Sequence, residues 1–360
     1  MTQPINSPAT SKRFSRAAFT MPRALTSPSD YYRMLDSRIV GHDRAKRKIA
    51  VQLAMKKKQT GHKKTCGQPN TCMLLLGPSG VGKTYLMETA ARVAGFQLMA
   101  LNASQLTAEG YRGVNLSSVM GRLQYACLTQ QTTLDRSILF LDEWDKRIMT
   151  GGNDSQYALS LQHEMLRIME GKPLELDDPQ GEQPVPISLD SSGLMLVFAG
   201  TFHSTPGTDS RRKPIGFESV RCRTSPDGEN DEIKRRLFDS GMLPEFYNRL
   251  TTIITLDAPQ KENLRKMLLM AGGELARCNE RINPSGLQIA LSPDASEAAI
   301  EYAMTSRLYA RGLKRLLDAA ANDLLFEGIH GHILLDPNDI QNVIAGKSIS
   351  VEENPETEGR

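Results

Sequence analysis

The stretch Gly77–Thr84, with the sequence GPSGVGKT, decides the fold that we expect for this chain. It fits the pattern G-x-x-x-x-G-K-[ST], in which glycines let backbone N–H groups turn toward phosphates and the following helix adds the partial positive charge of its N-terminus. In this pattern Lys83 reaches the β- and γ-phosphates and the Thr84 hydroxyl ligates Mg²⁺. The loop residues expected to contact a nucleotide are Pro78, Ser79, Gly80, Val81, Gly82, Lys83 and Thr84.

Apolar strands and helical patterns alternate around this loop. The segments TCMLLLG (71–77), SILFLDE (137–143) and LMLVFAG (194–200) are short and nearly continuously apolar, as strands buried on both faces of a parallel sheet are. Helical patterns occupy Thr84–Ala94 and Leu159–Met169. This alternation predicts an α/β domain with a central parallel sheet and helices on both of its faces.

The second apolar strand ends in two acids, Asp142 and Glu143. A strand that brings a carboxylate beside a phosphate-binding loop supplies the second half of such a site. Asp142 is expected to hold Mg²⁺ through its water shell, and Glu143 is placed to polarise the attacking water as a general base. The adjacent acid favours hydrolysis of ATP over phosphoryl transfer to a small acceptor.

The segments that flank this domain differ from it in composition. Residues 1–36 are rich in Ser, Thr, Pro and Arg and carry no acid before Asp30, so we expect them to be disordered. The segment Asp43–Gln59 is an amphipathic helix pattern, and the basic run Lys56–Lys58 is expected to be its solvated end. Residues 173–193 are punctuated by proline and aspartate, as a loop or hairpin is.

The chain becomes mainly helical after Pro259. Helices are expected over about Lys261–Ile282, Asp294–Ser306 and Ala310–Glu327, with short strands at Leu287–Ala290 and Gly331–Leu335. The expected organisation is a disordered segment (1–36), a large α/β ATPase domain (37–258), a small C-terminal domain (259–348) and a disordered tail (349–360).

Composition excludes several classes of protein. Hydrophobic residues make up 39% of the 360 residues and the net charge is only +3, which is typical of a globular protein and not of a dedicated nucleic-acid binder. The sequence shows no apolar run of the ~20 residues that a membrane helix needs, and no secretory signal. The five cysteines are few and scattered, so we expect free thiols in a reducing compartment and no zinc site.

In order along the chain, five motifs resemble those of the AAA+ ATPases, and in detail those of the ClpX branch of the Clp/Hsp100 protein unfoldases. They are the Ile39–His42 segment, the phosphate-binding loop, the LFLDE strand, GMLPEFYNRL (241–250) and YARGLKR (309–315). The resemblance covers about residues 38–335. It implies an AAA+ fold with a small C-terminal domain, ATP and Mg²⁺ as cofactors, and a hexameric ring that unfolds or remodels polypeptide substrates in a central pore.

The resemblance also implies roles for single residues. Arg249 matches the arginine finger that reaches the γ-phosphate of the neighbouring subunit, and Arg311 matches the sensor-2 arginine of the small domain. Val40 and Gly41 match the segment that packs on adenine, and Thr201 is our candidate for the sensor-1 polar residue. Gly110-Tyr111-Arg112-Gly113 matches the pore loop whose aromatic side chain grips the polypeptide, so Tyr111 and Arg112 are expected to contact substrate.

Ile215-Gly216-Phe217 resembles the tripeptide with which ClpX docks on the ClpP peptidase, which implies a ClpP-type partner. Departures from the family include the absence of a Cys-x-x-Cys zinc domain, Arg112 beside the pore tyrosine, and Tyr309 where glycine is common. Two alternatives stay open: a remodeller that works without a peptidase, and a DNA-directed AAA+ motor. The expected location is the cytoplasm, with the mitochondrial matrix as the alternative because the acid-poor leader is similar to a transit peptide.

Overall fold

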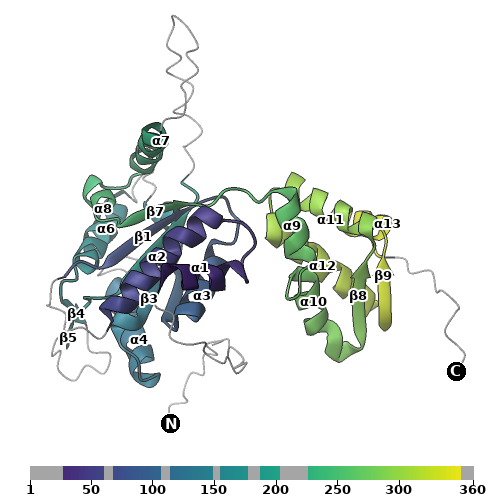
Figure 1. Cartoon of the computed structure of the whole chain (residues 1–360), viewed down its shortest axis with the longest axis horizontal. Coiled ribbons are helices and arrows are strands. Elements are labelled where there is room, and N and C mark those ends of the chain that lie inside the picture. Colours follow the sequence, from purple (N-terminus) through teal and green to yellow (C-terminus); the bar gives the residue numbers. More distant parts are fainter. Residues whose placement is uncertain are drawn as a thin grey trace, which may run out of the picture.

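The computed structural model describes residues 27–60, 68–106, 114–148, 155–176, 187–202 and 226–349. They form a large α/β unit and a small, mainly helical unit, joined by the segment between β7 (Thr252–Thr255) and α9 (Lys261–Leu269) (Figure 1). This architecture confirms the predicted fold class. The domain boundary that we predict at residues 258 and 259 lies on this connecting segment. Among the described residues, every helix is too short or too polar to cross a bilayer.

Five parallel strands form the central sheet of the large unit, in the order β2-β3-β6-β1-β7. Their bounds are β1 Thr71–Leu76, β2 Gln97–Asn102, β3 Ser137–Asp142, β6 Met195–Gly200 and β7 Thr252–Thr255. The three central strands are the three apolar runs, and nearly all their residues are buried. The edge strands β2 and β7 are mostly half-buried, so no continuous apolar run in the sequence indicates them.

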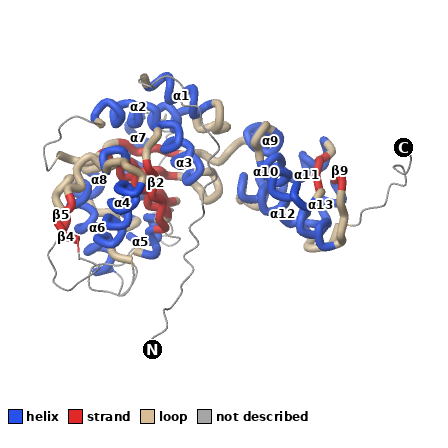
Figure 2. The backbone as a smooth tube through the Cα atoms, turned by 90° about the horizontal axis from the view of Figure 1, so that it is seen from below, coloured by secondary structure: helices blue, strands red, loops and turns tan. Residues whose placement is uncertain are grey.

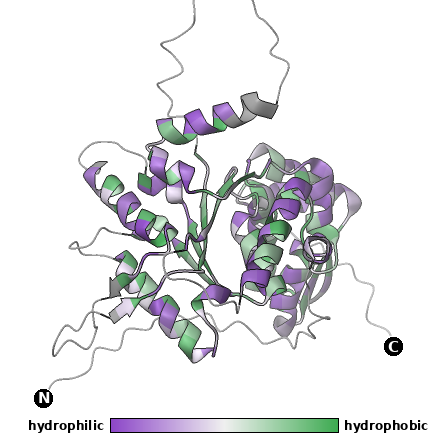
Figure 3. Cartoon of the chain, turned by 60° about the vertical axis from the view of Figure 1, so that its left-hand side comes forward, coloured by the Kyte–Doolittle hydropathy of each residue, from purple (hydrophilic) through white to green (hydrophobic). Residues whose placement is uncertain are grey.

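Helices cover both faces of this sheet, as Figure 2 shows. Successive residues of a strand point to opposite faces, so Met73 and Leu75 of β1 enter one hydrophobic core and Leu74 and Leu76 enter the other. Hydrophobic residues accordingly follow the strands between the two layers (Figure 3). The helices of the large unit are α1 Pro28–Asp36, α2 Asp43–Gln59, α3 Lys83–Ala94, α4 Leu116–Thr129, α5 Trp144–Ile148, α6 Ser155–Met169, α7 Pro226–Asp239 and α8 Pro244–Asn248.

The expectation that all of residues 1–36 are disordered is wrong for residues 27–36. Ser27 and Asp30 form a reciprocal capping box, in which the Asp30 N–H donates to the Ser27 hydroxyl over 3.2 Å. This cap stabilises the first turn of α1, and Tyr31 and Leu35 are buried on its inner face. The capping signature was present in the sequence, but it stands in a segment whose composition otherwise indicates disorder.

Helix α2 has the predicted bounds, and its apolar residues Ala45, Ile49, Leu53 and Ala54 are all buried. The expectation of a solvated basic end is wrong for Lys56, whose exposed fraction is 1%. Neighbouring Lys57 lies over the Phe96 ring and donates to the Ala94 carbonyl oxygen. Long lysine stems pack along apolar surface while their ammonium groups keep polar partners, so a run of lysines does not by itself indicate a solvated surface.

A short hairpin lies in the segment predicted to be a loop or hairpin. Its two antiparallel strands are β4 (Leu174–Leu176) and β5 (Ile187–Leu189). Residues 177–186 between them lie outside the described residues.

The small unit packs its helices on a two-stranded parallel sheet formed by β8 (Leu287–Leu291) and β9 (Gly331–Leu335). The single helix predicted over Lys261–Ile282 is wrong, because the chain turns at Met270–Gly273, where Gly272 adopts a left-handed φ of +78°. The other predicted helices and both strands are confirmed to within two residues. The helices of this unit are α9 Lys261–Leu269, α10 Glu274–Ile282, α11 Pro293–Thr305, α12 Tyr309–Phe326 and α13 Pro337–Ile344.

Candidate nucleotide site

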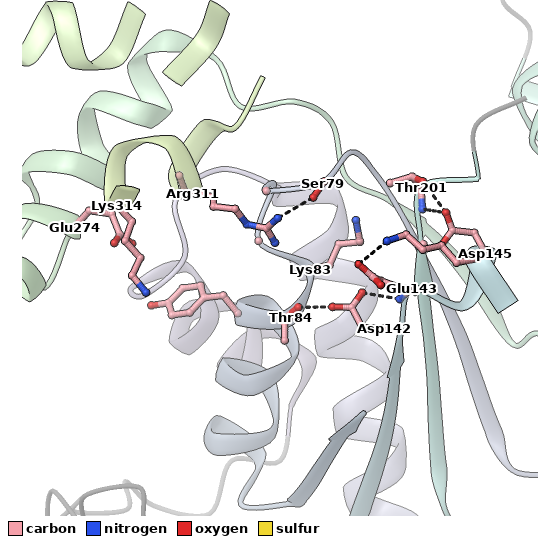
Figure 4. Close-up of a pocket in the computed structure, with 16 residues that line it drawn as sticks. Ser79, Lys83, Thr84, Asp142, Glu143, Asp145, Thr201, Glu274, Arg311 and Lys314 are labelled. Atoms are coloured by element: carbon pink, nitrogen blue, oxygen red, sulfur yellow. Dashed lines mark hydrogen bonds and ion pairs between the residues drawn. The ribbon is translucent and has the colours of Figure 1, made fainter. Parts of the chain in front are cut away.

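A pocket of about 370 Å³ lies at the carboxyl ends of β1, β3 and β6, between the large unit and helices α10 and α12 of the small unit. Most of the acids and bases predicted to act on a nucleotide line it (Figure 4). We call it the phosphate pocket. Its lining consists of Ser79, Gly80, Gly82, Lys83, Thr84, Tyr85, Asp142, Glu143, Asp145, Lys146, Gly200, Thr201, Glu274, Ala310, Arg311 and Lys314.

The phosphate-binding loop connects β1 to α3, as its sequence predicts. Gly80 and Gly82 adopt φ angles of +81° and +95°, in the left-handed region that favours glycine. A Cβ atom on Gly80 would stand 2.6 Å from the Leu308 carbonyl oxygen of the small unit. Glycine is therefore needed at position 80 for the backbone angle and for the close approach of the two units.

Lys83 lies in the first turn of α3 and is 9% exposed. Its ammonium group donates to the carbonyl oxygens of Gly77 and Pro78 over 2.7 and 2.9 Å. Burial lowers the pKa of Lys83, and the nearby carboxylates of Asp142 and Asp145 oppose that shift. The loop carbonyls thus hold the cation inside the loop, at the position from which it can reach phosphate oxygens.

Thr84 and Asp142 bring two oxygen atoms together, as predicted. The Thr84 hydroxyl donates to Asp142 Oδ2 over 2.8 Å, and Asp142 Oδ1 accepts the Glu143 N–H over 2.9 Å. Within the described residues, no group of three or more His, Cys, Asp or Glu side chains forms a metal cage. A hydroxyl and a carboxylate without such a cage fit Mg²⁺, which keeps several waters and takes further ligands from phosphates.

Glu143 follows Asp142 with a left-handed φ of 56°. One oxygen of its carboxylate accepts from the Asn102 amide over 2.9 Å, and the other pairs with Lys146 over 3.0 Å. The hydrogen bond from Lys146 and that from Asn102 lower the pKa of Glu143. The group is therefore ionised at neutral pH, as a general base must be.

Thr201 lies directly after β6 and meets an acid that the sequence analysis missed. Asp145 Oδ2 accepts three hydrogen bonds, from the Thr201 hydroxyl (2.6 Å), the Thr201 N–H (3.0 Å) and the Phe202 N–H (3.3 Å). Asp145 is only 4% exposed. Its position on α5, one turn from the strand that ends in Asp142, was the only sequence signal for this role.

The small unit supplies Arg311, whose guanidinium donates to the Ser79 hydroxyl over 3.2 Å. Two residues earlier, buried Tyr309 adopts a left-handed φ of 49°. A non-glycine residue in that region costs about 1–3 kcal/mol, which accounts physically for glycine being common at this position. In this chain the turn before Arg311 is therefore formed by a tyrosine in the left-handed region.

A second pocket of about 160 Å³ adjoins the first, and we call it the base pocket. Val40 lines it together with the apolar side chains of Ile39, Val81, Met267 and Met270. Gly41 does not line it. The backbone of Gly41, with φ +72°, passes so close to Asn263 that a Cβ atom would lie 2.9 Å from the amide nitrogen.

His42, which also lines the base pocket, belongs to the Ile39–His42 motif but was given no role of its own from the sequence. One of its ring nitrogens lies 3.1 Å from the Val81 carbonyl oxygen. Burial lowers the pKa of His42, so the ring is neutral at pH 7 and adds no charge to the pocket.

Arg249 lies away from both pockets. Its guanidinium forms an ion pair with Glu170, and it is close enough to Cys72 to act electrostatically on that thiol, whose pKa burial raises to about 12. Cys72 stands at the beginning of β1, whereas the phosphate-binding loop follows the end of that strand. Arg249 thus lies near the amino-terminal end of β1, whereas the nucleotide loop of its own chain follows the carboxyl end of that strand.

The other predicted contact residues lie outside the described residues. They are Tyr111 and Arg112 of the expected pore loop and Ile215, Gly216 and Phe217 of the expected docking tripeptide.

Comparisons with known proteins agree with this geometry. Residues 73–206 match the family described as "ATPase family associated with various cellular activities (AAA)". The "ATP-dependent Clp protease ATP-binding subunit ClpX" of Borrelia duttonii (strain Ly) is 28% identical over 326 residues, which cover 85% of this chain and 75% of the relative. The protein of the same name from Borrelia recurrentis (strain A1) gives the same values. "ClpX 2" of Wolinella succinogenes is 26% identical over 315 residues, covering 84% of this chain and 78% of the relative. By these similarities the chain resembles the ClpX-like AAA+ ATPases over most of its length, and the resemblance supports binding and hydrolysis of ATP.

Proposed function

We propose that this protein is an ATP-driven unfoldase or remodelling chaperone, which assembles as a hexameric ring and threads polypeptide through a central pore. The observation that carries this proposal is the composition of the phosphate pocket. Lys83, Thr84, Asp142 and Glu143 come from the large unit, and Arg311 comes from the small unit. A pocket shared between two units changes their relative position when its contents change, so hydrolysis there can drive mechanical work.

The residues of the phosphate pocket divide the chemistry of hydrolysis among them. Lys83 leaves the Gly77 and Pro78 carbonyl oxygens and binds the β- and γ-phosphates. Thr84 and Asp142 hold Mg²⁺, which neutralises phosphate charge when bound. Glu143 orients the attacking water and accepts its proton, while Thr201 presents a hydroxyl whose position Asp145 determines.

Arg311 links this chemistry to movement of the small unit. Its hydrogen bond to Ser79 joins α12 directly to the phosphate-binding loop. Phosphates in the loop offer the guanidinium a stronger, charge-assisted partner than a serine hydroxyl. Binding and loss of the γ-phosphate then pull on α12 and release it, which changes the angle between the units.

Substrate gripping is assigned to Tyr111 in the loop between β2 and α4. Tyr111→Ala is expected to stop ATP-dependent unfolding of a tagged fluorescent reporter while most of the ATPase activity remains, because the loop touches polypeptide and not nucleotide. Loss of reporter fluorescence and release of phosphate are measured in parallel. Tyr125→Phe is a matched control, since Tyr125 is 73% exposed on α4. Unfolding at the wild-type rate by the Tyr111→Ala variant would contradict this assignment.

A ClpP-type peptidase is the partner that we propose for the Ile215-Gly216-Phe217 segment. Phe217→Ala is expected to abolish co-sedimentation with such a peptidase and to leave ATP hydrolysis unchanged, since an aromatic anchor contributes a large share of the affinity of a small docking motif. If wild-type protein and variant bind the peptidase equally, the segment is not the docking site. Absence of binding by the wild type would favour a remodeller that works without a peptidase.

A further inference from the structure

The phosphate pocket and the base pocket share one wall. Gly82, Tyr85, Glu274 and Ala310 line both pockets. This inference rests on the proposed nucleotide binding: if phosphates occupy one pocket and the base occupies the other, the ribose must lie along the shared wall. The side chains of that wall therefore determine which sugar is accepted.

Glu274 is the one residue of this wall with an acceptor left for a sugar. Gly82 and Ala310 have no polar side chain. The Tyr85 hydroxyl already accepts from Arg277 over 3.0 Å and donates to the Arg38 carbonyl oxygen over 3.4 Å. Glu274 Oε1 accepts from Arg277 over 2.9 Å, whereas Oε2 has no hydrogen-bond partner within the described part of the chain.

The Glu274 carboxylate is held in place from two sides. Its helix begins immediately after Gly273, where a Cβ atom would stand 2.6 Å from the Met267 carbonyl oxygen, so the chain makes a tight turn before Glu274. Arg277, one turn further along α10, lies over the Tyr85 ring with its guanidinium carbon 5.0 Å from the ring centroid. Tyr85 directly follows Thr84, so the nucleotide loop of the large unit orients this carboxylate of the small unit through Arg277.

Burial and position suit the carboxylate for recognition of a ligand. The Glu274 side chain is 15% exposed, and that of its partner Arg277 is 44% exposed. Figure 4 shows Glu274 beside Lys314 on the small-unit side of the phosphate pocket. This carboxylate is largely shielded from bulk water and borders both pockets, so a hydroxyl donor that enters the pockets finds an acceptor at Oε2.

We propose that Glu274 is a specificity-determining residue that accepts hydrogen bonds from the ribose hydroxyls of the bound nucleotide. A carboxylate accepts from two neighbouring hydroxyls, as acids do in dinucleotide-binding folds. Hydrogen bonds to charged groups are stronger than those between neutral groups. The site accordingly prefers ribonucleotides to 2′-deoxyribonucleotides, because the deoxy sugar leaves this carboxylate oxygen without one of its partners.

The test compares equilibrium binding of ADP and 2′-deoxy-ADP to the full chain by titration calorimetry. The wild type is expected to bind ADP roughly 10-fold more tightly than 2′-deoxy-ADP, the ratio that 1.4 kcal/mol produces. Glu274→Ala is expected to weaken ADP binding and bring this ratio close to 1. Glu274→Gln keeps an acceptor for Arg277 but loses the charge, so its ratio falls between those two values.

Glu280→Ala is the matched control, an exposed acid on the same helix α10, and its ratio is expected to equal that of the wild type. An unchanged ratio in both Glu274 variants, or equal affinities of the wild type for the two nucleotides, would overturn the inference. Failure of the wild type to bind either nucleotide would instead overturn the proposed function. The two failures are therefore distinguishable in one experiment.

Discussion

Glu143→Gln is expected to reduce the turnover of ATP by about 10²–10⁴-fold while ATP binding and ring assembly persist. Glutamine cannot accept the proton of the attacking water, yet its amide oxygen still accepts from Asn102, which now lies 2.9 Å from the Glu143 carboxylate. Because the variant keeps the shape of the pocket, the loss falls on kcat. Phosphate release and binding of a fluorescent ATP analogue measure the two quantities separately.

The matched control for this experiment is Glu301→Gln, which removes the same charge from an exposed position on α11. Its turnover is expected to match that of the wild type. Hydrolysis at the wild-type rate in Glu143→Gln would show that another group activates the water, and the proposed mechanism would then be wrong. Because it binds substrate without release, the Glu143→Gln variant also serves to capture natural polypeptide substrates.

Arg249→Ala is expected to lower ATP turnover by about 10³–10⁵-fold, the range measured when arginine fingers are supplied or removed. Arg249 is not in the pocket of its own chain. It pairs with Glu170 and lies near the amino-terminal end of β1. A group that acts on the γ-phosphate from there must act on the next subunit. Head-to-tail contacts of this kind close into rings.

Mixing the two variants distinguishes action on the neighbour from action within one chain. Arg249→Ala subunits keep Glu143, and Glu143→Gln subunits keep Arg249, so mixed rings contain complete sites although both parents are inactive. When the two variants mix randomly in equal amounts, roughly a quarter of the interfaces between subunits contain both Glu143 and Arg249. ATP turnover is expected to recover to about that fraction of the wild-type rate. If mixing restores no ATPase activity, Arg249 does not act on the site of the neighbouring subunit.

Arg33→Ala is the control for loss of a surface ion pair. Arg33 is 75% exposed and pairs with Asp30 one turn away on α1. Exposed pairs of this kind contribute about 0–1 kcal/mol, so turnover and assembly are expected to be unchanged. A loss of activity in this control equal to that of Arg249→Ala would mean that the assay reports general destabilisation.

Local sequence was sufficient for the features whose cause is local. The glycines and lysine of residues 77–84 predicted the loop, because their backbone freedom and charge act within eight consecutive residues. Continuous apolar runs predicted β1, β3 and β6, since strands in the middle of a parallel sheet are buried on both faces. The edge strands β2 and β7 and the break between α9 and α10 were not predicted from the sequence. Half-buried strands and a single turn leave weaker hydrophobic patterns than buried strands do.

The remaining features depend on contacts between residues far apart in the chain. Asp145 reaches Thr201 across 56 positions and Arg311 reaches Ser79 across 232, and no periodicity or motif encodes such distances. The sequence by itself determined the fold class, the nucleotide loop and the paired acids, because each follows from neighbouring residues. Only the tertiary structure decided which acid positions Thr201, that Glu274 and Tyr85 border both pockets, and that Arg249 lies outside the phosphate pocket of its own chain. Those facts arise from how segments far apart in the chain pack together, both within the large unit and between the two units, and no single segment specifies such contacts.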